Sequence, residues 1–192
     1  VLGRNVGQNN AQRYRLINEG VIVPNQRPNA RIDGFTITGA DHAGGIVVNG
    51  YAHYLEIDNN RIQNNSGVYG GGIRIGHPDV INPATDGYQS AFNDNVGVHH
   101  NQIVTNGSTL GDGGGLALFT GADAYKVTGN YFCGNFSSGN GGGLAHVGLS
   151  DNAEISGNTF LFNESFNQGA TVAGGGLFIG GGMPLGTSGV SP

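Results

Sequence analysis

The sequence predicts an all-β solenoid, a right-handed parallel β-helix of about five coils with three short strands each, and three observations lead to it. A phrase of apolar residues, paired Asn residues and a Gly run recurs along the chain. No copy of the phrase holds the amphipathic run of about 10–12 residues that a helical repeat would need. Gly and Asn punctuate every copy, which is typical of short strands joined by tight bends.

The phrase is clearest between Val127 and Val147. An apolar residue, Val127, is followed by Asn130, Phe132 and Asn135, and then by a Gly run that leads into Leu144. The first apolar residues of successive copies lie 25, 41, 29 and 28 residues apart, and the earliest copy lacks the Asn pair: Ile32, Ile57, Val98, Val127 and Ile155. Units of this size cannot bury their apolar side chains alone, so neighbouring copies must stack.

Stacking gives the Asn residues a physical role. One column should lie at the first bend of each coil and a second at the next bend: Asn60, Asn101, Asn130 and Asn158, then Asn65, Asn106, Asn135 and Asn163. Each amide can donate to one neighbour and accept from the other, and Asn tolerates the left-handed backbone of a sharp bend. The strand period of two should turn Leu144 and His146 inward and Ala145 outward.

Over about residues 31–181 the phrase resembles the right-handed parallel β-helix repeat proteins of the pectin-lyase-like superfamily. The resemblance implies the fold, and it allows either a carbohydrate-active enzyme or a non-catalytic module. We expect residues 1–30 to be an irregular segment or cap, residues 31–182 to form the β-helix, and residues 183–192 to be a tail or the start of another coil. A cap or neighbour would cover the open strand edges, and the chain is expected to belong to a larger protein or to meet a neighbouring subunit.

Composition excludes two classes of function. The 192 residues carry a net charge of −5 and only 11% charged residues, with no Lys/Arg cluster that could neutralise phosphates, so we expect no nucleic-acid partner. No run approaches 18 apolar residues, so no membrane-spanning helix is expected. Cys133 is the single Cys, which rules out an internal disulfide and favours a small apolar side chain at the edge of an inward strand.

Two expansions of the repeat predict protruding loops. About 14 extra residues lie within Gly76–Asn93, and a second, shorter expansion lies between Asn163 and Leu177. Insertions in repeat proteins often carry the binding surface. The alternative for the first is a tolerated surface insertion, and for the second a loop that packs its own aromatic residue on the coil. The polar and aromatic residues suited to sugar contact are His77, Asp79, Asp86, Tyr88 and Phe92 in the first loop, and Glu164, Phe166 and Gln168 in the second.

One acidic column emerges from the repeat alignment. His53, Asp94, Asp123 and Asp151 each lie four residues before the first apolar residue of their coil. Like charges about 5 Å apart repel by roughly 1 kcal/mol in water, so the three carboxylates need compensation. Ca²⁺ is one candidate, since it takes carboxylate oxygens in flexible geometry. The alternative is that each Asp accepts N–H bonds within its own turn and that no cofactor is present.

Catalytic candidates are few. The outward residues of the strand that follows the Gly run are apolar apart from Arg74, and they contain no carboxylate pair: Val47, Arg74, Ala117, Ala145 and Phe178. Asp58 and His99 are the one acid–base pair expected on neighbouring coils. Lys126 and Glu154 should form a surface ion pair, which contributes little. His99 and His100 are adjacent, so on a strand they should face opposite sides and not share a metal.

These observations favour a structural or adhesive module of a larger extracellular or cell-surface protein, with a periplasmic location also open, that contacts polysaccharide through its loops. The first alternative is a polysaccharide lyase or glycoside hydrolase that uses Asp58, His99, Arg74 and the Asp column. The second alternative is a filament-forming subunit, because exposed strand edges could join end to end. Concentration-dependent sedimentation would test the filament.

Overall fold

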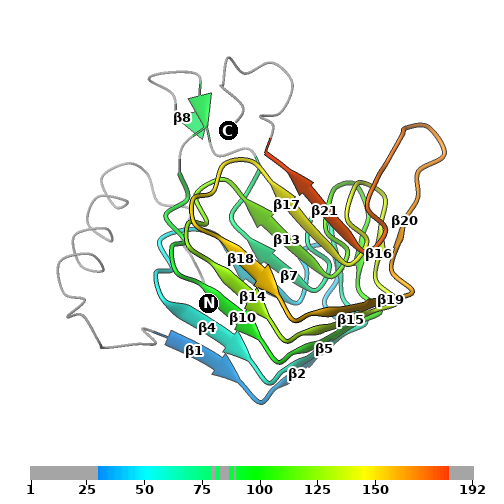
Figure 1. The fold of residues 1–192 in the computed structure, drawn as a ribbon. Coiled ribbons are helices and arrows are strands. Elements are labelled where there is room, and N and C mark those ends of the chain that lie inside the picture. Colours follow the sequence, from blue (N-terminus) through cyan, green and yellow to red (C-terminus); the bar gives the residue numbers. More distant parts are fainter. Residues whose placement is uncertain (1–29, 79–80, 83–86, 89, 182–192) are drawn as a thin grey trace.

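The computed structural model describes residues 30–78, 81–82, 87–88 and 90–181, and these residues form a right-handed parallel β-helix of about five coils (Figure 1). The expected fold is therefore confirmed, and the first described strand begins at Ala30. The expected cap and tail lie outside the described residues, apart from Ala30. Among the described residues, no helical segment has the length and apolar character needed to cross a bilayer.

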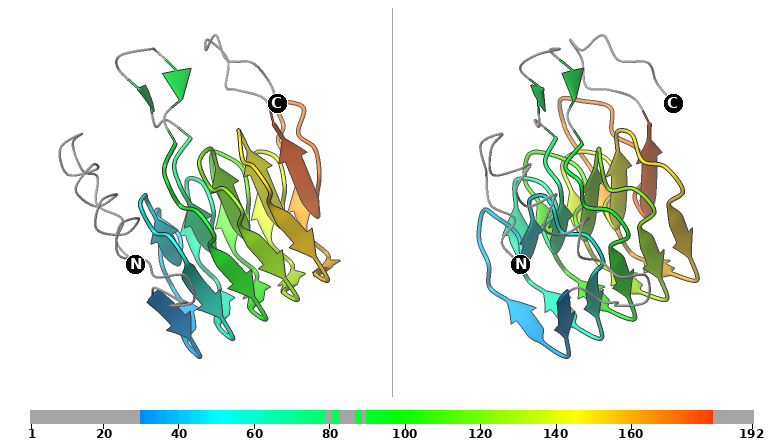
Figure 2. Two further views of the ribbon diagram at one scale, coloured as in Figure 1. Left: turned by 60° about the vertical axis from the view of Figure 1, so that its left-hand side comes forward. Right: turned by 90° about the vertical axis from the view of Figure 1, so that its left-hand side faces the viewer.

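The strands of successive coils pair into four parallel sheets, called A to D in the order in which the chain enters them. Sheets A and B meet along one edge of the solenoid (Figures 1 and 2). Sheet A consists of β1 (Ala30–Asp33), β4 (Leu55–Asp58), β10 (Gly97–His99), β14 (Lys126–Thr128) and β18 (Glu154–Ser156). Sheet B consists of β2 (Thr36–Thr38), β5 (Arg61–Gln63), β11 (Gln102–Val104), β15 (Tyr131–Cys133) and β19 (Thr159–Leu161). Every pairing in both sheets is parallel, with Ile57, Val98 and Val127 in one register row.

Sheets C and D complete each coil. Sheet C consists of β6 (Ser66–Gly67), β12 (Gly107–Ser108), β16 (Phe136–Ser137) and β20 (Glu164–Ser165). Sheet D consists of β3 (Ile46–Val48), β7 (Ile73–Ile75), β13 (Leu116–Phe119), β17 (Leu144–Val147) and β21 (Leu177–Gly180). Sheet C was not predicted: it adds a fourth strand to coils that were expected to have three. Its strands are only two residues long, too short to show the alternation that marks a strand in sequence.

The core is a continuous column of inward aliphatic and aromatic side chains. Ile57, Ile62, Ile73, Leu116 and Phe132 are fully buried, and the Phe132 ring stacks on Phe160 of the next coil at a centroid distance of 4.7 Å. Each of these residues occupies an inward position of a short strand, as the alternation predicts. Burial of this column between coils is the main force that holds the array together.

Both Asn columns form hydrogen-bonded ladders through the interior. In the first ladder the side-chain oxygen of each Asn after Asn60 accepts from the backbone N–H and the side-chain amide of the preceding ladder Asn, as Asn101 does from Asn60 at 3.0 and 3.1 Å. Asn106 accepts from Asn65 in the second ladder in the same way. The sequence suggested that the ladder Asn itself would adopt the left-handed backbone. In the structure the residue before each ladder Asn adopts it.

That preceding residue has a positive φ in every regular coil. Before the first ladder these residues are Asn59, His100, Gly129 and Gly157, and before the second they are Asn64, Thr105, Gly134 and Phe162. The bend thus requires the left-handed region whichever residue occupies it, although only Gly adopts it without cost. The ladder Asn that follows points into the core, where its amide satisfies the backbone groups of the turn.

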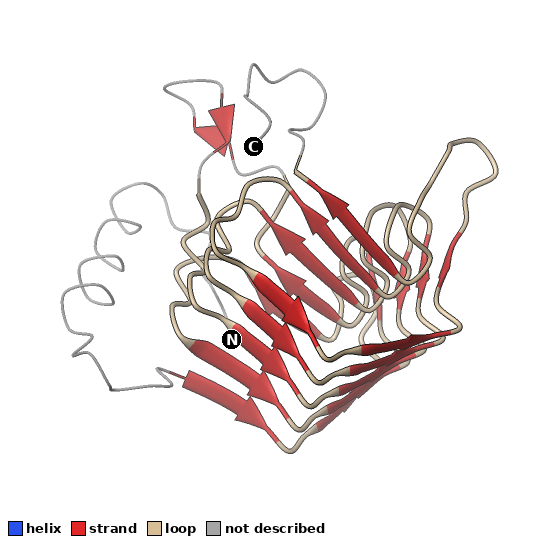
Figure 3. Ribbon diagram, viewed as in Figure 1, coloured by secondary structure: helices blue, strands red, loops and turns tan. Residues whose placement is uncertain are grey.

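The first expansion of the repeat stands off the corner between sheets D and A (Figures 2 and 3). Its described part is a small antiparallel hairpin of β8 (Ile81–Asn82) and β9 (Gly87–Tyr88). The second expansion extends as a loop beyond β20 at a different corner (Figure 1). Both protrusions therefore lie where the sequence places them.

Candidate functional site

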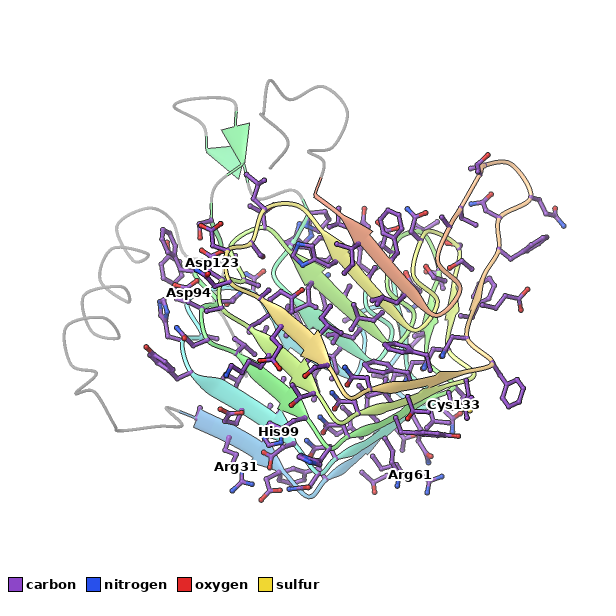
Figure 4. The ribbon with its side chains drawn as sticks, viewed as in Figure 1. Arg31, Arg61, Asp94, His99, Asp123 and Cys133 are labelled. Carbon is purple, nitrogen blue, oxygen red and sulfur yellow. The ribbon has the colours of Figure 1, made fainter. Side chains whose placement is uncertain are left out.

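The outer face of sheet A carries the densest group of charged and titratable side chains among the described residues. The inward apolar row of this sheet consists of Ile32, Ile57 and Val98, and strand alternation turns the residues on either side of that row outward. The outward set on the first three coils is Arg31, Asp33, Glu56, Asp58 and His99. Figure 4 shows Arg31 and His99 together on this side of the molecule.

Asp58 forms a bidentate pair with Arg31. The Arg31 Nε donates to Asp58 Oδ1 at 2.8 Å, a terminal guanidinium nitrogen donates to Oδ2, and the Asn59 amide also donates to Oδ2 at 2.9 Å. The Asp58 side chain is only 1% exposed. Hydrogen bonding from Arg31 lowers the pKa of this carboxyl, so Asp58 is ionised and fixed. Both oxygens are thus engaged by donors of the protein itself.

His99 is the register partner of Asp58, as the alignment predicts, but the two side chains bond elsewhere. The His99 Nε2 lies 3.1 Å from Glu56 Oε2, and its Nδ1 lies 3.0 Å from Nδ1 of His100. The expected Asp58–His99 acid–base pair is therefore replaced by two separate contacts, Arg31–Asp58 and Glu56–His99.

The expectation that His99 and His100 face opposite sides is wrong. His100 ends β10 and adopts a φ of 54°, so the alternation of the strand no longer applies to it. The two rings meet nearly at right angles, with centroids 5.2 Å apart. The turn thus brings two neighbouring imidazoles together on one side of the sheet.

Gly97 makes room for the Glu56 side chain. A Cβ added at Gly97 would overlap the Glu56 carboxylate and lie 2.7 Å from its Cδ carbon. The other outward residues in this row all have side chains: Arg31, Glu56, Lys126 and Glu154. The missing side chain lets Glu56 lie across the neighbouring coil and reach His99. Further along the same row, Lys126 Nζ lies 3.9 Å from Glu154 Oε2, the expected surface ion pair.

Arg74 belongs to a different surface. It lies on β7 in the outer face of sheet D, so it shares no site with Asp58 and His99 of sheet A. Its Nε atom is buried and makes no hydrogen bond to the described residues, and burial lowers the pKa of the guanidinium. Its outward neighbours Ala117 and Ala145 are fully buried, so the apolar stripe expected on this face is largely covered.

The Asp column exists, and Figure 4 shows Asp94 and Asp123 close together at one corner. Asp94 Oδ2 lies 3.2 Å from Nδ1 of His53, and Asp123 Oδ1 accepts the N–H of Asp151 at 2.8 Å. Burial raises the pKa of Asp123, and the charges of Asp94 and Asp151 raise it further, while the bond from Asp151 opposes them. Asp94 and Asp123 thus each have a partner on a neighbouring coil, while Asp94 Oδ1 is buried without a hydrogen-bond partner among the described residues.

The Ca²⁺ hypothesis for this column stays a prediction. Among the described residues, no group of three or more His, Cys, Asp or Glu side chains is placed to hold a metal ion.

The first loop contributes little that can be described as a binding surface. His77 packs edge-on against Tyr69, and Phe92 stacks on Tyr51 with centroids 5.2 Å apart. Asp79 and Asp86 lie outside the described residues, and only the backbone of Tyr88 is described.

The second loop lies beside a group of exposed aromatic side chains. Glu164, Phe166 and Gln168 are all exposed, as expected for a contact loop. The neighbouring exposed apolar residues of the last two coils are Tyr131, Phe136, Leu161 and Phe162. Phe162 is 87% exposed and Phe166 is 52% exposed. Cys133 faces the outer side of β15 with Tyr131 rather than the core, which differs from the sequence expectation.

His146 is inward, as predicted, and forms a buried polar pair with Tyr125. The Tyr125 hydroxyl lies 3.0 Å from His146 Nδ1, and His146 Nε2 donates to the carbonyl of Gly148 at 3.0 Å. Burial lowers the pKa of His146 and raises the pKa of Tyr125 to about 12. The contacts fit a neutral imidazole that accepts from Tyr125, so His146 acts as a satisfied core residue.

This pair predicts acid sensitivity. Below a pH of about 6.5 the unfolded chain takes up a proton at His146 before the folded chain does, so acidification favours unfolding. We expect the double variant Tyr125→Phe/His146→Leu to lose less stability than wild type between about pH 6.5 and pH 5, measured by urea unfolding. His146→Leu alone leaves the Tyr125 hydroxyl unpaired and should cost about 1–3 kcal/mol at neutral pH. Parallel pH dependences of the double variant and wild type would contradict this role.

Sequence reasoning missed Arg31, Glu56 and His100 as partners in the sheet A site. A signal for His100 was available, because Gly129 and Gly157 occupy the same repeat position and indicate a positive φ there. Gly97 was a similar signal, since it is the only Gly in its outward row. The diagonal reach of Arg31 to Asp58 has no sequence signal, because Arg31 is in register with Glu56.

Comparison of the chain with protein-family models, with curated proteins and with solved structures finds no match.

Proposed function

We propose that the chain is a structural or adhesive β-helix module, working outside the cell or at its surface, that contacts glycans without cleaving them. The observation that carries the proposal is the group of exposed aromatic side chains on the last two coils beside the second loop. Exposed apolar groups of this kind mark interaction surfaces. The flat, apolar faces of pyranose rings are suited to stacking on such side chains, and the polar groups of Glu164 and Gln168 suit the sugar hydroxyls.

The stack of coils supports a scaffolding role. Parallel pairing, the filled core and two buried Asn ladders run through all regular coils and fix the spacing of outward side chains. Neighbouring coils lie roughly 4.8 Å apart, so exposed side chains on two coils can contact the same polymer. The exposed rings of Tyr131, Phe136, Phe162 and Phe166 are called the aromatic platform below. A rigid platform loses little entropy when a polymer binds.

The second candidate is a polysaccharide lyase or glycoside hydrolase of the pectin-lyase-like kind. The specific observation in its favour is the concentration of Glu56, Asp58 and His99 on one outer face. Against it, Asp58 is held by Arg31 and Asn59, which leaves it poorly placed to move a proton. Arg74, the basic residue expected to assist, lies on another sheet.

The test is a panel of acidic and neutral polysaccharides, with and without Ca²⁺, in which retention of the protein and new chain ends are followed together. We expect retention without new chain ends, and loss of most retention in Phe162→Ala/Phe166→Ala. The matched control is Phe35→Ala, because Phe35 is 58% exposed but lies on the first coil. Equal retention of the double variant would overturn the aromatic platform.

The remaining outcomes of the panel are also decisive. Cleavage of a polysaccharide would contradict the non-catalytic module and support the enzyme, and Asp58→Asn and Asp123→Asn would be the first variants to assay. An absence of retention on every polymer would refute the glycan proposal. A requirement for Ca²⁺ that Asp123→Asn removes would support the ion predicted for the Asp column.

A further inference from the structure

Two imidazole nitrogens converge on the outer face of sheet A. His99 Nδ1 and His100 Nδ1 are 3.0 Å apart, and the two rings are nearly perpendicular. The side chain of His99 is 29% exposed and His100 is exposed, so solvent reaches the pair. The other described His residues have different ring partners: His42 with Asp41, His53 with Asp94, His77 with Tyr69, and His146 with Tyr125.

The Glu56 carboxylate determines which nitrogen of His99 is free to act as a ligand. A carboxylate only accepts, so Nε2 of His99 carries the proton that Glu56 Oε2 accepts at 3.1 Å. The neutral ring then has a lone pair on Nδ1, directed toward His100. A carboxylate that orients a ligating His through its other ring nitrogen is the usual outer-sphere arrangement of metal sites.

We propose that His99 and His100 bind one divalent transition-metal ion through their Nδ1 atoms, with water completing its coordination. Imidazole suits Cu²⁺, Ni²⁺ and Zn²⁺, which it binds at about 2.0–2.1 Å. Two nitrogens at that distance and at a right angle around the metal are roughly 3.0 Å apart, the spacing already present here. Without metal, His100 Nδ1–H donates to His99 Nδ1. On binding, that proton moves through solvent to Nε2 of His100, and both rings turn so that their Nδ1 lone pairs point at the metal.

The surroundings favour a cation. Asp58 lies close enough to interact electrostatically with both His99 and His100, and Glu56 adds a second carboxylate. Asp58 is not a ligand because it is held by Arg31, whose positive charge also offsets that of Asp58, so Glu56 supplies the remaining negative charge beside the pair. Gly129 of the next coil leaves space for His100, because a Cβ there would lie 3.3 Å from its Nε2. The site is separate from the Asp column and from the aromatic platform.

The test is titration of the full chain with Cu²⁺, followed by calorimetry and by electron paramagnetic resonance. We expect one equivalent to bind with two imidazole nitrogens in the spectrum, and affinity to follow Cu²⁺ above Ni²⁺ and Zn²⁺, and these above Mn²⁺. His99→Asn and His100→Asn should each remove this binding. His42→Asn is the matched control, because His42 is exposed beside Asp41 and should not contribute.

The outer carboxylate provides a second, independent readout. Glu56→Gln and Gly97→Ala should each lower the Cu²⁺ affinity about 10–100-fold, the first by losing the charge and the second by displacing Glu56. Their controls are Glu154→Gln on the same sheet and Gly107→Ala, where an added Cβ meets nothing within 4 Å. Binding that survives in His99→Asn/His100→Asn, or no binding by wild type, would overturn the proposal and leave the pair as a hydrogen bond only.

Discussion

We expect Asn101→Ala to lower the free energy of unfolding by about 3 kcal/mol, because it removes an amide that serves three coils. Asn101 is 1% exposed. Its oxygen accepts from the backbone N–H of Asn60, and its Nδ2 donates to the carbonyl of Ile57 at 2.8 Å and to the oxygen of Asn130 at 3.0 Å. Alanine leaves these buried groups unpaired, and each unpaired group costs about 1–3 kcal/mol.

The control lies in the same ladder. Asn158 is only half-buried, on the last coil of the ladder, so water can replace part of what its amide supplies. Asn158→Ala should therefore cost about 1 kcal/mol. Both variants can be compared by urea unfolding, with the slope of the transition used to confirm that the same surface is exposed. Equal losses for the two positions would show that the interior ladder contributes no more than its end.

The repeat phrase predicted the solenoid because its signals are local and recur at the same position. Ile57, Val98 and Val127 fall in one register row, and the Asn pairs fall in two ladders, as their common spacing requires. Every copy of the phrase has to fit the same spacing of apolar and Asn residues, so a wrong alignment of one copy would conflict with the next copy. The fourth strand escaped prediction because strands such as Ser66–Gly67 are defined by backbone pairing alone.

The side-chain partners on sheet A were less predictable for a different reason. Register places His99 beside Asp58, but long side chains also reach diagonal neighbours, and charge decides among them. Arg31 takes Asp58 with two parallel bonds, which a His cannot match. His99 therefore bonds to Glu56. The positive φ of His100 also brings the His100 ring next to His99, which strand alternation alone would not predict.

The Gly run before sheet D predicts the second large effect. Gly114 is buried against the backbone of the next coil, and an added Cβ would lie 2.5 Å from the carbonyl carbon of Phe136 on that coil, with two carbonyl oxygens still nearer. Backbone cannot turn aside as a side chain can, so the two coils must separate. We expect Gly114→Ala to lower the free energy of unfolding by about 3 kcal/mol, the upper end for overpacking.

Gly107→Ala is the control that separates this steric overlap from the general effect of replacing a Gly by Ala. Gly107 is also on the path of the coil, has no positive φ, and has open space where its Cβ would lie. Alanine there should be neutral or stabilise by about 0.4–1 kcal/mol, because it restricts the unfolded chain. If Gly114→Ala were as mild as Gly107→Ala in urea unfolding, the spacing between coils would be adjustable. If it is costly, as we expect, the Gly runs are required because stacked coils approach one another there with backbone against backbone.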